Sequence, residues 1–250
     1  MNRRDEAHGK KGAGRGTRRG RVEETEIEKI ERELVERQNA IANWTPKTEL
    51  GRMIKAGKIN SLNEVYDKGF KVMEPEIIDS LTRLDEHLIQ VARTTRVTRA
   101  GRKYSYRADV LLGNKDGYIG VGSAKDADRF PAINKAKRMA KLNLLRVYRG
   151  SGSWEEQATD DKHSVPFKVE GKSGSVRVVL LPAPKGTGLA VGKAIRPVME
   201  LAGIRNVWGQ TKGRSTISLN FVQAALDALM QTGKMKASKD VERKILKGHA

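Results

Sequence analysis

Residues 102–122 have the sequence RKYSYRADVLLGNKDGYIGVG. From residue 104 to residue 112, apolar and aromatic side chains alternate with polar ones, which is the period of a strand that buries one face. Residues 114–117 end in Asp-Gly, a dipeptide typical of tight hairpin turns, and residues 118–121 continue as a further strand. We therefore predict two hairpins, which turn at Ala100-Gly101 and at Asp116-Gly117.

Helical patterns flank these strands on both sides. Pro75 begins a helical pattern that changes to alternation near Ile89, with apolar positions Ile77, Ile78, Leu81, Leu84 and Leu88. After the strands, Pro131 begins a second helix, whose predicted buried stripe is Ile133, Ala136, Ala140, Leu144 and Val147. The order of helix, three strands and helix is that of double-stranded-RNA-binding domains, although other small folds share it.

In the second half of the chain, the sequence pattern predicts a hairpin and a β-α-β unit. Two short strands, residues 165–169 and 175–181, flank a turn at residues 171–174. A helix from about residue 192 is expected to end at Gly203, and a strand follows at residues 206–210. A last helix is predicted from about residue 218 to residue 232. The predicted fold class is therefore α+β, with a second domain of the α/β kind.

The region before Pro75 predicts a basic arm and then short helices. Residues 1–22 are rich in Gly and Arg and cannot bury enough apolar surface to fold alone, so a disordered arm is expected. A capping box at Thr25 and Glu28 indicates an acidic amphipathic helix up to residue 42. Further helices are predicted to start at Thr45-Pro46 and at Ser61.

Composition divides the whole chain into six segments. They are the arm (1–22), a helical extension (23–74), a first domain (75–150), a polar linker (151–163), a C-terminal domain (164–233) and a basic tail (234–250). The linker is placed by its Gly and Ser residues and by the polar stretch that follows them. A chain of 250 residues is long enough for two such domains to have real cores.

Charge is the strongest signal in the composition. The chain has 49 Lys and Arg against 30 Asp and Glu, a net charge of +19 and a pI near 10.2, which indicates a polyanionic partner. Residues 1–22 hold eight basic and two acidic residues, while residues 93–107 and 135–149 each hold six basic residues and no acidic one. These segments account for 18 of the 19 net charges, so we expect the remainder to be close to neutral.

The basic segments predict sites that bind the phosphates of RNA. Around Gly101, guanidinium and ammonium groups lie near a tight turn with no acid among them, which favours phosphate contact over an ordinary solvated turn. In the helix after Pro131, phosphate contact and an ordinary solvated face are equally favoured, because Lys and Arg suit any exposed helix face. The predicted RNA-binding residues are Arg93, Arg96, Thr98, Arg99, Arg102, Lys103, Arg107, Lys135, Arg138, Arg15, Arg18 and Arg19. For Tyr104, Tyr106 and Tyr118, core or half-buried strand positions are favoured over base stacking.

Enzyme, metal and membrane functions are disfavoured. The chain has no cysteine, which excludes disulfides, thiolate ligands and thiol catalysis and suits the cytoplasm. No apolar run approaches the length that spans a bilayer. Residues 186–194 lack the spacing and the hydroxyl of a phosphate-binding loop, so phosphoryl transfer is the weakest alternative. The histidines, His163 among them, are isolated in the sequence and are expected to have surface or incidental roles. No cofactor is predicted.

Four motifs resemble one protein family. They are residues 45–51 (TPKTELG), 117–122 (GYIGVG), 182–188 (PAPKGTG) and 200–204 (ELAGI). Together they are similar to the fifth small-subunit ribosomal protein family, and the first motif is typical of its archaeal and eukaryotic type. The resemblance implies a double-stranded-RNA-binding-like domain, followed by an α/β domain whose β-α-β crossover is left-handed, an exception to the usual rule.

The same resemblance implies a non-enzymatic role in the small ribosomal subunit, in the cytoplasm. It implies contact with small-subunit ribosomal RNA, a position near the messenger RNA entry channel, and a share in subunit assembly and decoding accuracy. Residues 98–103 correspond to a hairpin loop that reaches ribosomal RNA. Gly186, Gly188 and Arg196 correspond to the interface with small-subunit ribosomal protein four, while proteins eight and two are further candidate partners. The alternative is a free double-stranded-RNA-binding module outside the ribosome.

Overall fold

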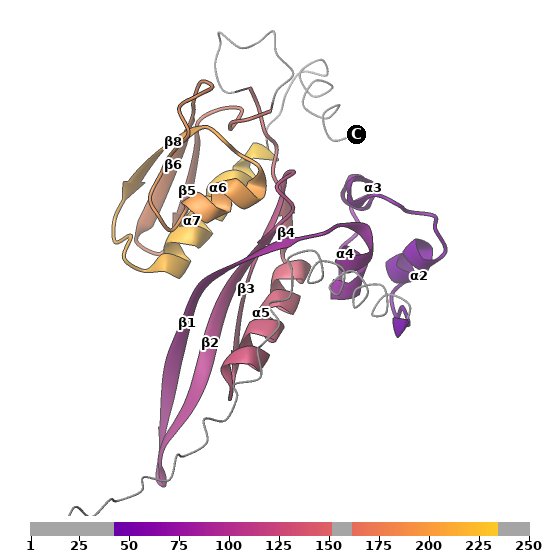
Figure 1. The fold of residues 1–250 in the computed structure, drawn as a ribbon, viewed down its shortest axis with the longest axis vertical. Coiled ribbons are helices and arrows are strands. Elements are labelled where there is room, and N and C mark those ends of the chain that lie inside the picture. Colours follow the sequence, from indigo (N-terminus) through magenta and orange to yellow (C-terminus); the bar gives the residue numbers. More distant parts are fainter. Residues whose placement is uncertain (1–42, 152–161, 235–250) are drawn as a thin grey trace, which may run out of the picture. The chain divides into compact units, whose positions relative to one another are not determined.

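The computed structural model describes residues 43–151 and 162–234 (Figure 1). Within these ranges the chain forms two four-stranded sheets and six helices, which confirms the predicted mixed α/β character. The strand orders are β1-β2-β3-β4 and β5-β6-β8-β7. The predicted arm, the helix up to residue 42, most of the linker and nearly all of the tail lie outside the described residues, as do Arg15, Arg18 and Arg19.

The first sheet is antiparallel and contains both predicted hairpins. Its strands are β1 (Asp85–Thr98), β2 (Gly101–Gly113), β3 (Tyr118–Asp126) and β4 (Leu144–Arg146). In the two turns, Gly101 and Gly117 have φ values of 112° and 90°, which a residue with a Cβ rarely adopts. Helix α5 (Arg129–Leu142) packs on β2 and β3.

The helix that begins at Pro75 is shorter than predicted. Helix α4 (Pro75–Leu81) ends where Thr82 takes an extended backbone conformation, and β1 begins at Asp85 instead of near Ile89. Leu84 and Leu88 have helical spacing but lie outside the helix. Pairing of β1 with β2 therefore outweighs the local helical preference of these residues.

Helix α5 also differs from its prediction at both ends. It begins at Arg129, before Pro131, and it ends at Leu142, so Leu144 and Val147 do not belong to its buried stripe. Leu144 lies in β4, which pairs with the start of β3. The apolar spacing was real, but Leu144 is buried within an added strand and Val147 is buried just after it, outside the helix.

Two glycines of β3 let α5 lie directly against the sheet. A Cβ at Gly122 would clash with the carbonyl oxygen of Ala136, and a Cβ at Gly120 would clash with that of Ala140. On the helix side, Ala132, Ala136 and Ala140 are fully buried at this contact. Small residues on both elements thus set the distance between helix and sheet, which explains the glycines of the GYIGVG motif.

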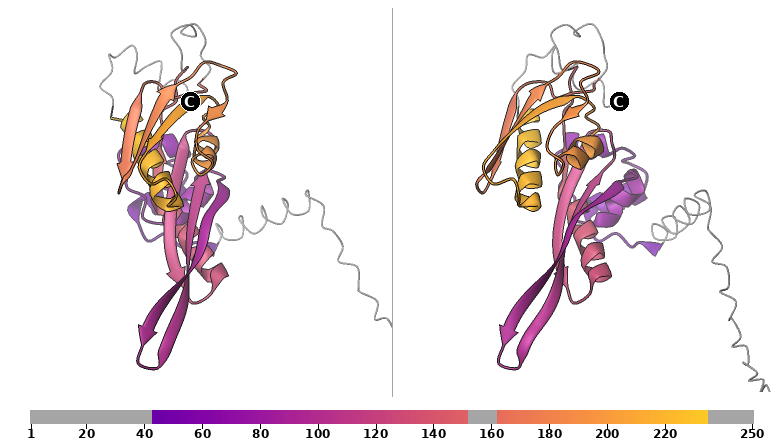
Figure 2. Two further views of the ribbon diagram at one scale, coloured as in Figure 1. Left: turned by 90° about the vertical axis from the view of Figure 1, so that its left-hand side faces the viewer. Right: turned by 60° about the vertical axis from the view of Figure 1, so that its left-hand side comes forward.

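The second sheet contains a β-α-β unit, but its first strand, Leu189–Ala190, was not predicted, and the predicted strand 175–181 pairs antiparallel with the last strand of the unit. Its strands are β5 (Val169–Ser173), β6 (Val176–Pro182), β7 (Leu189–Ala190) and β8 (Val207–Lys212). Helix α6 (Arg196–Ala202) connects β7 to β8, which are parallel, and α7 (Ser218–Thr232) packs on β5 and β6 (Figure 2). Helix α6 begins four residues later than predicted, and Gly203 ends it with a φ of 78°, as expected.

The first hairpin of this sheet is shifted from its predicted position. β5 begins at Val169, where the strand was expected to end, so Gly171 lies inside the strand and the turn falls at Gly174. A Cβ at Gly171 would clash with the carbonyl oxygen of Ala224 in α7. This glycine therefore serves the packing of a helix on the strand and not a turn.

The helical extension is tied to Glu74. Its helices α2 (Glu49–Lys55) and α3 (Leu62–Asp67) are capped by Thr48 and Ser61, so α3 starts as predicted and α2 starts after Thr45-Pro46. The Glu74 carboxylate accepts hydrogen bonds from Trp44 Nε1 at 2.8 Å and from the N–H of Thr48 at 2.6 Å. Burial opposes ionisation of this carboxyl, but the hydrogen bonds outweigh it and hold the pKa of Glu74 below its ordinary value.

The extension shares an apolar cluster with the first sheet. Leu50, Ile59 and Leu62 of the extension pack in the same cluster as Tyr118 and Leu144 of the sheet. The hydroxyl of Tyr66 donates to the carbonyl oxygen of Leu144 at 2.8 Å, and burial raises the pKa of Tyr66 to about 12. The extension is thus part of the folded unit that includes β3 and β4.

The two sheets are joined by hydrogen bonds and by a common core. Leu111 and Ile119 of the first sheet belong to the same buried cluster as the inner side chains of α6 and α7. The N–H of Lys115 donates to the carbonyl oxygen of Leu201 at 2.9 Å, and the N–H of Gly117 donates to that of Ala202 at 3.2 Å. Each half therefore covers apolar surface of the other.

We expect Gly122→Ala to destabilise the chain by about 1–3 kcal/mol, because α5 must move away from β3 to accept the methyl group. Chemical denaturation of the full chain measures this loss. Lys125→Ala, at an exposed position of the same strand, is the control and should leave stability nearly unchanged. Equal stability of Gly122→Ala and the unmodified chain would show that the close contact carries no constraint.

Candidate nucleic-acid interface

The β1–β2 hairpin extends beyond the rest of its sheet. β3 pairs with β2 only up to Tyr106, so residues 94–105 form a two-stranded ribbon with no further described strand beside it (Figure 1). The hydroxyl of Thr98 donates to the carbonyl oxygen of Gly101 at 3.0 Å and helps to close the turn. The five basic side chains from Arg93 to Lys103 are exposed. The predicted contact residues therefore lie on a projecting part of the fold.

The register of the ribbon places like charges opposite one another. Arg96 lies directly across from Lys103, so their side chains leave the same face. Two like charges in such a pair destabilise an antiparallel ladder. The guanidinium of Arg93 lies 4.5 Å from the centroid of the Tyr104 ring, which leaves its positive charge at the surface. An anion placed against the ribbon would relieve the repulsion that the fold leaves in place.

Arg107, which lies outside the ribbon, differs from the predicted residues nearer the turn. Its Nε lies 3.1 Å from Oδ1 of Asp109 and also donates to the hydroxyl of Ser123. Asp109 is fully buried and accepts a further hydrogen bond from Gln90. By contrast, no basic residue from 93 to 103 forms an ion pair within the described part of the chain. Arg107 thus has a structural role, and the available charge lies nearer the tip.

The basic segment around α5 is largely neutralised by acids from elsewhere in the chain. Its ion pairs are Lys135–Asp126, Lys137–Glu86, Lys141–Asp79, Arg146–Asp67 and Arg149–Asp116. Hydrogen bonds from Lys135 and from the N–H of Ala127 hold the pKa of Asp126 below its ordinary value. The side chains of Arg146 and Arg149 are only 8% and 11% exposed. Of the six cations, Arg138 alone is exposed and without an ion pair to a described residue.

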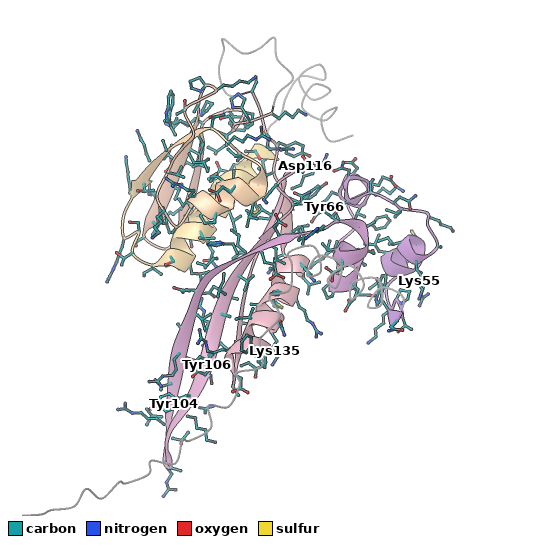
Figure 3. All side chains as sticks on the ribbon, viewed as in Figure 1. Lys55, Tyr66, Tyr104, Tyr106, Asp116 and Lys135 are labelled. Carbon is teal, nitrogen blue, oxygen red and sulfur yellow. The ribbon has the colours of Figure 1, made fainter. Side chains whose placement is uncertain are left out.

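The three tyrosines differ in their environments, and two of them, Tyr104 and Tyr106, are labelled in Figure 3. Tyr118 is buried, as predicted, and burial raises its pKa to about 12. Tyr106 packs against the alanine-rich core beneath α5, which also agrees with the prediction. Tyr104 is 49% exposed, so a core position for this side chain is wrong. The reason is that α5 and β3 do not extend far enough to cover this part of β2.

The second predicted site is a loop that precedes β7 and α6. Gly186 and Gly188 have φ values of 86° and 69°, and the N–H of Gly188 donates to Oδ1 of Asn206 at 2.9 Å. Nδ2 of Asn206 lies 2.9 Å from Nδ1 of His163, which is only 2% exposed. The expected surface position of His163 is therefore wrong, because the side chain is buried and contacts Asn206, which holds this loop. Arg196 is exposed at the start of α6.

A basic surface in the second half of the chain was not predicted from the sequence. Residues 162–234 contain 11 basic and three acidic residues, so this region is not close to neutral. Residues 23–92 and the linker each have a net negative charge, which cancels this positive charge in the net charge of the whole chain. The expectation of a neutral remainder was wrong for this reason. A count over each predicted domain would have found this charge.

The described ranges contain no candidate for a metal site or for a membrane-spanning helix. Within residues 43–151 and 162–234, no group of three or more His, Cys, Asp or Glu residues is arranged to hold a metal ion. The same residues include no helix that combines the length and the apolar character needed to cross a bilayer.

Comparison with known proteins identifies the family. The model described as "Ribosomal protein S5, N-terminal domain" matches residues 84–148, and the model described as "Ribosomal protein S5, C-terminal domain" matches residues 171–244. The "Small ribosomal subunit protein uS5" of Methanothermobacter thermautotrophicus is 48% identical over 196 residues, which cover 78% of this chain and 90% of the relative. The chain belongs to the ribosomal protein S5 family. The protein of the same name from Staphylothermus marinus is 46% identical over 207 residues, 80% of this chain and 94% of the relative.

Both predicted contact regions of this S5 family member lie in parts that the family models cover. The ribbon falls within the N-terminal model, and the loop with Gly186 and Gly188 falls within the C-terminal model. The relatives named above are archaeal, in agreement with the type suggested by the TPKTELG motif.

We expect the double variant Arg99→Glu with Arg102→Glu to bind RNA more weakly than the unmodified chain. Each lost phosphate contact should lower the slope of log affinity against log salt by roughly one unit, because fewer counterions are released. Fluorescence anisotropy with a labelled RNA stem-loop over a series of salt concentrations measures both effects. Lys68→Glu with Lys71→Glu, at exposed positions of the extension, makes the same charge change as a control. An unchanged slope in the ribbon variant would remove the ribbon from the interface.

Proposed function

We propose that this chain is a structural, non-enzymatic constituent of the small ribosomal subunit and that it binds ribosomal RNA. The observation that carries the proposal is the β1–β2 hairpin, whose cations from 93 to 103 have no ion-pair partner among the described residues. Family membership and the names of the relatives support the same setting. Such cations contact phosphates at places defined by RNA shape, without reading the base sequence. The proposal assigns no catalytic residue, cofactor or small-molecule substrate.

The proposal extends to the place of the chain in the particle. The chain acts in the cytoplasm near the messenger RNA entry channel and contributes to subunit assembly and decoding accuracy. Arg196 and the loop with Gly186 and Gly188 contact small-subunit ribosomal protein four, and proteins eight and two are further neighbours. Two features support a protein contact: Arg196 is exposed, and Asn206 holds the loop in a defined shape.

The proposal also includes the two domains and the handedness of the crossover between β7 and β8. Residues 75–150 form a double-stranded-RNA-binding-like domain, residues 164–233 form the C-terminal domain, and the crossover from β7 through α6 to β8 is left-handed. The order of α4, three long strands and α5 supports the first statement, and the parallel pairing of β7 with β8 supports the presence of a crossover. Residues 151–163 connect the two domains.

The alternative is a free double-stranded-RNA-binding module. Removing residues 160–250 does not test it cleanly, because Leu111 and Ile119 would lose the core of α6 and α7 that covers them. The location of the intact chain in its own cells distinguishes the two functions instead.

We expect the tagged full chain to sediment with the small ribosomal subunit through a sucrose gradient at moderate salt and at high salt. A protein that is built into the subunit stays bound at high salt, because a large interface holds it. A protein held only by exposed ion pairs would be released, because salt weakens such pairs. A tagged cytoplasmic protein with no ribosomal role, run in the same gradient, is the control. Chain at the top of both gradients would overturn the proposal and support the free module.

We expect Arg196→Glu to alter misreading of the genetic code while the chain still assembles into subunits. The reason is that the charge change alters a proposed protein contact and leaves the RNA-binding ribbon intact. Reporter misreading rates and the amount of chain in small subunits measure the two effects. Lys193→Glu, at an exposed position just before α6, is the matched control. Misreading equal to that of the unmodified chain would count against the role of Arg196.

A further inference from the structure

The second sheet has one face that no described helix covers. Helix α7 packs on the opposite face (Figure 2), and there Gly171 approaches the backbone of Ala224 and Ala228. Because side chains alternate along a strand, the neighbours of Gly171 in β5 point away from α7. The register carries this alternation across β6 and β8. We call the side away from α7 the open face.

Three cations form a row across the open face. Lys172 of β5 lies opposite Arg177 of β6, and Arg177 lies opposite Lys212 of β8. All three are exposed. Neighbouring strands are about 4.8 Å apart, so three positive charges stand side by side where like charges destabilise the pairing. A fold without a polyanionic partner has no evident reason to keep this row.

One carboxylate lies close to the row but does not neutralise it. Glu170 Oε1 is 3.8 Å from a terminal nitrogen of Arg177, and the two side chains are 51% and 55% exposed. An ion pair that is long and well solvated contributes little. With 11 basic and three acidic residues in 162–234, the surrounding charge also favours an anion.

An exposed aromatic side chain lies on the same face. Trp208 is 44% exposed and lies opposite Leu181 of β6, on the same side of β8 as Gln210 and Lys212. Large aromatic side chains on an open sheet face can stack on the bases of single-stranded RNA, while neighbouring cations contact its phosphates. Stacking requires unpaired bases, so a duplex does not satisfy this arrangement.

We propose that the open face is a second RNA-binding surface, which binds a single-stranded segment through phosphate contacts at Lys172, Arg177 and Lys212 and base stacking on Trp208. This surface lies on a different sheet from the ribbon. Its place on ribosomal RNA rests on the proposed function, but the binding itself is a property of the purified chain. An acidic protein partner would satisfy the cation row but would leave the stacking role of Trp208 unused.

The test uses the purified full chain and a labelled, unstructured oligouridylate, with affinity measured by anisotropy at several salt concentrations. The first variant combines Lys172→Gln, Arg177→Gln and Lys212→Gln, and the second is Trp208→Ala. The control combines Lys58→Gln, Lys68→Gln and Lys71→Gln, which removes the same charge at exposed positions of the extension. Thermal melting confirms that each variant folds, and the first variant should melt no lower than the unmodified chain.

The expected results separate charge from stacking. The cation variant should lower the salt slope by about two units relative to the control, because three single-strand phosphate contacts are lost. Trp208→Ala should weaken binding on the order of tenfold and keep the slope. Equal slopes for the cation variant and the control, or unchanged affinity of Trp208→Ala, would overturn the proposal.

A second measurement separates this proposal from the proposed function. If the cation variant binds oligouridylate as the unmodified chain does, yet is washed from the small subunit at high salt, the open face binds a protein and the proposal is overturned. If the unmodified chain never sediments with the subunit, the proposed function fails, while the oligouridylate result still decides whether the open face binds RNA.

Discussion

The carbonyl oxygens of Leu201 and Ala202, at the end of α6, accept hydrogen bonds from the turn between β2 and β3, and the described fold depends on this contact. A helix end leaves its last carbonyl groups without partners inside the helix, so a neighbouring turn that supplies N–H groups stabilises both elements. Gly113 permits the approach, because a Cβ there would lie 2.6 Å from the carbonyl oxygen of Leu201. The two sheets consequently share one core and are not two independent modules.

Among the described residues, some basic side chains form ion pairs with acids of the same fold, and others remain at the surface without such a pair. Around α5, acids such as Asp67 and Asp79 reach the cations of a segment that has no acid of its own. The ribbon and the open face instead keep rows of like charge, at Arg96 with Lys103 and at Lys172 with Arg177. An unfavourable row that the fold does not neutralise is a stronger sign of an anionic partner than the number of cations in a segment.

Several features of the fold were predictable because their cause is local. The turn glycines Gly101 and Gly117 require a backbone conformation that other residues avoid, so both hairpins could be placed from sequence. The errors have a common cause in long-range contacts. Leu144 has helical spacing but pairs as a strand with β3, and Gly171 resembles a turn residue but lies under α7. The position of the ribbon tip was predictable in the same way, whereas its exposure, which leaves Tyr104 uncovered, was not.

The sequence by itself determined the mixed α/β class, the two hairpins, the concentration of unbalanced positive charge near Gly101, and the family, because each depends on residues that are neighbours in the chain. The tertiary structure alone decided which cations are available. Register across strands placed Lys172, Arg177 and Lys212 in one row, although they are up to 40 residues apart in the sequence. Arg146 and Arg149 form ion pairs with Asp67 and Asp116, which are distant in the sequence, and the two arginine side chains are only 8% and 11% exposed. The physical reason is that electrostatic interactions depend on distance in space, and distance in space follows from strand pairing and packing.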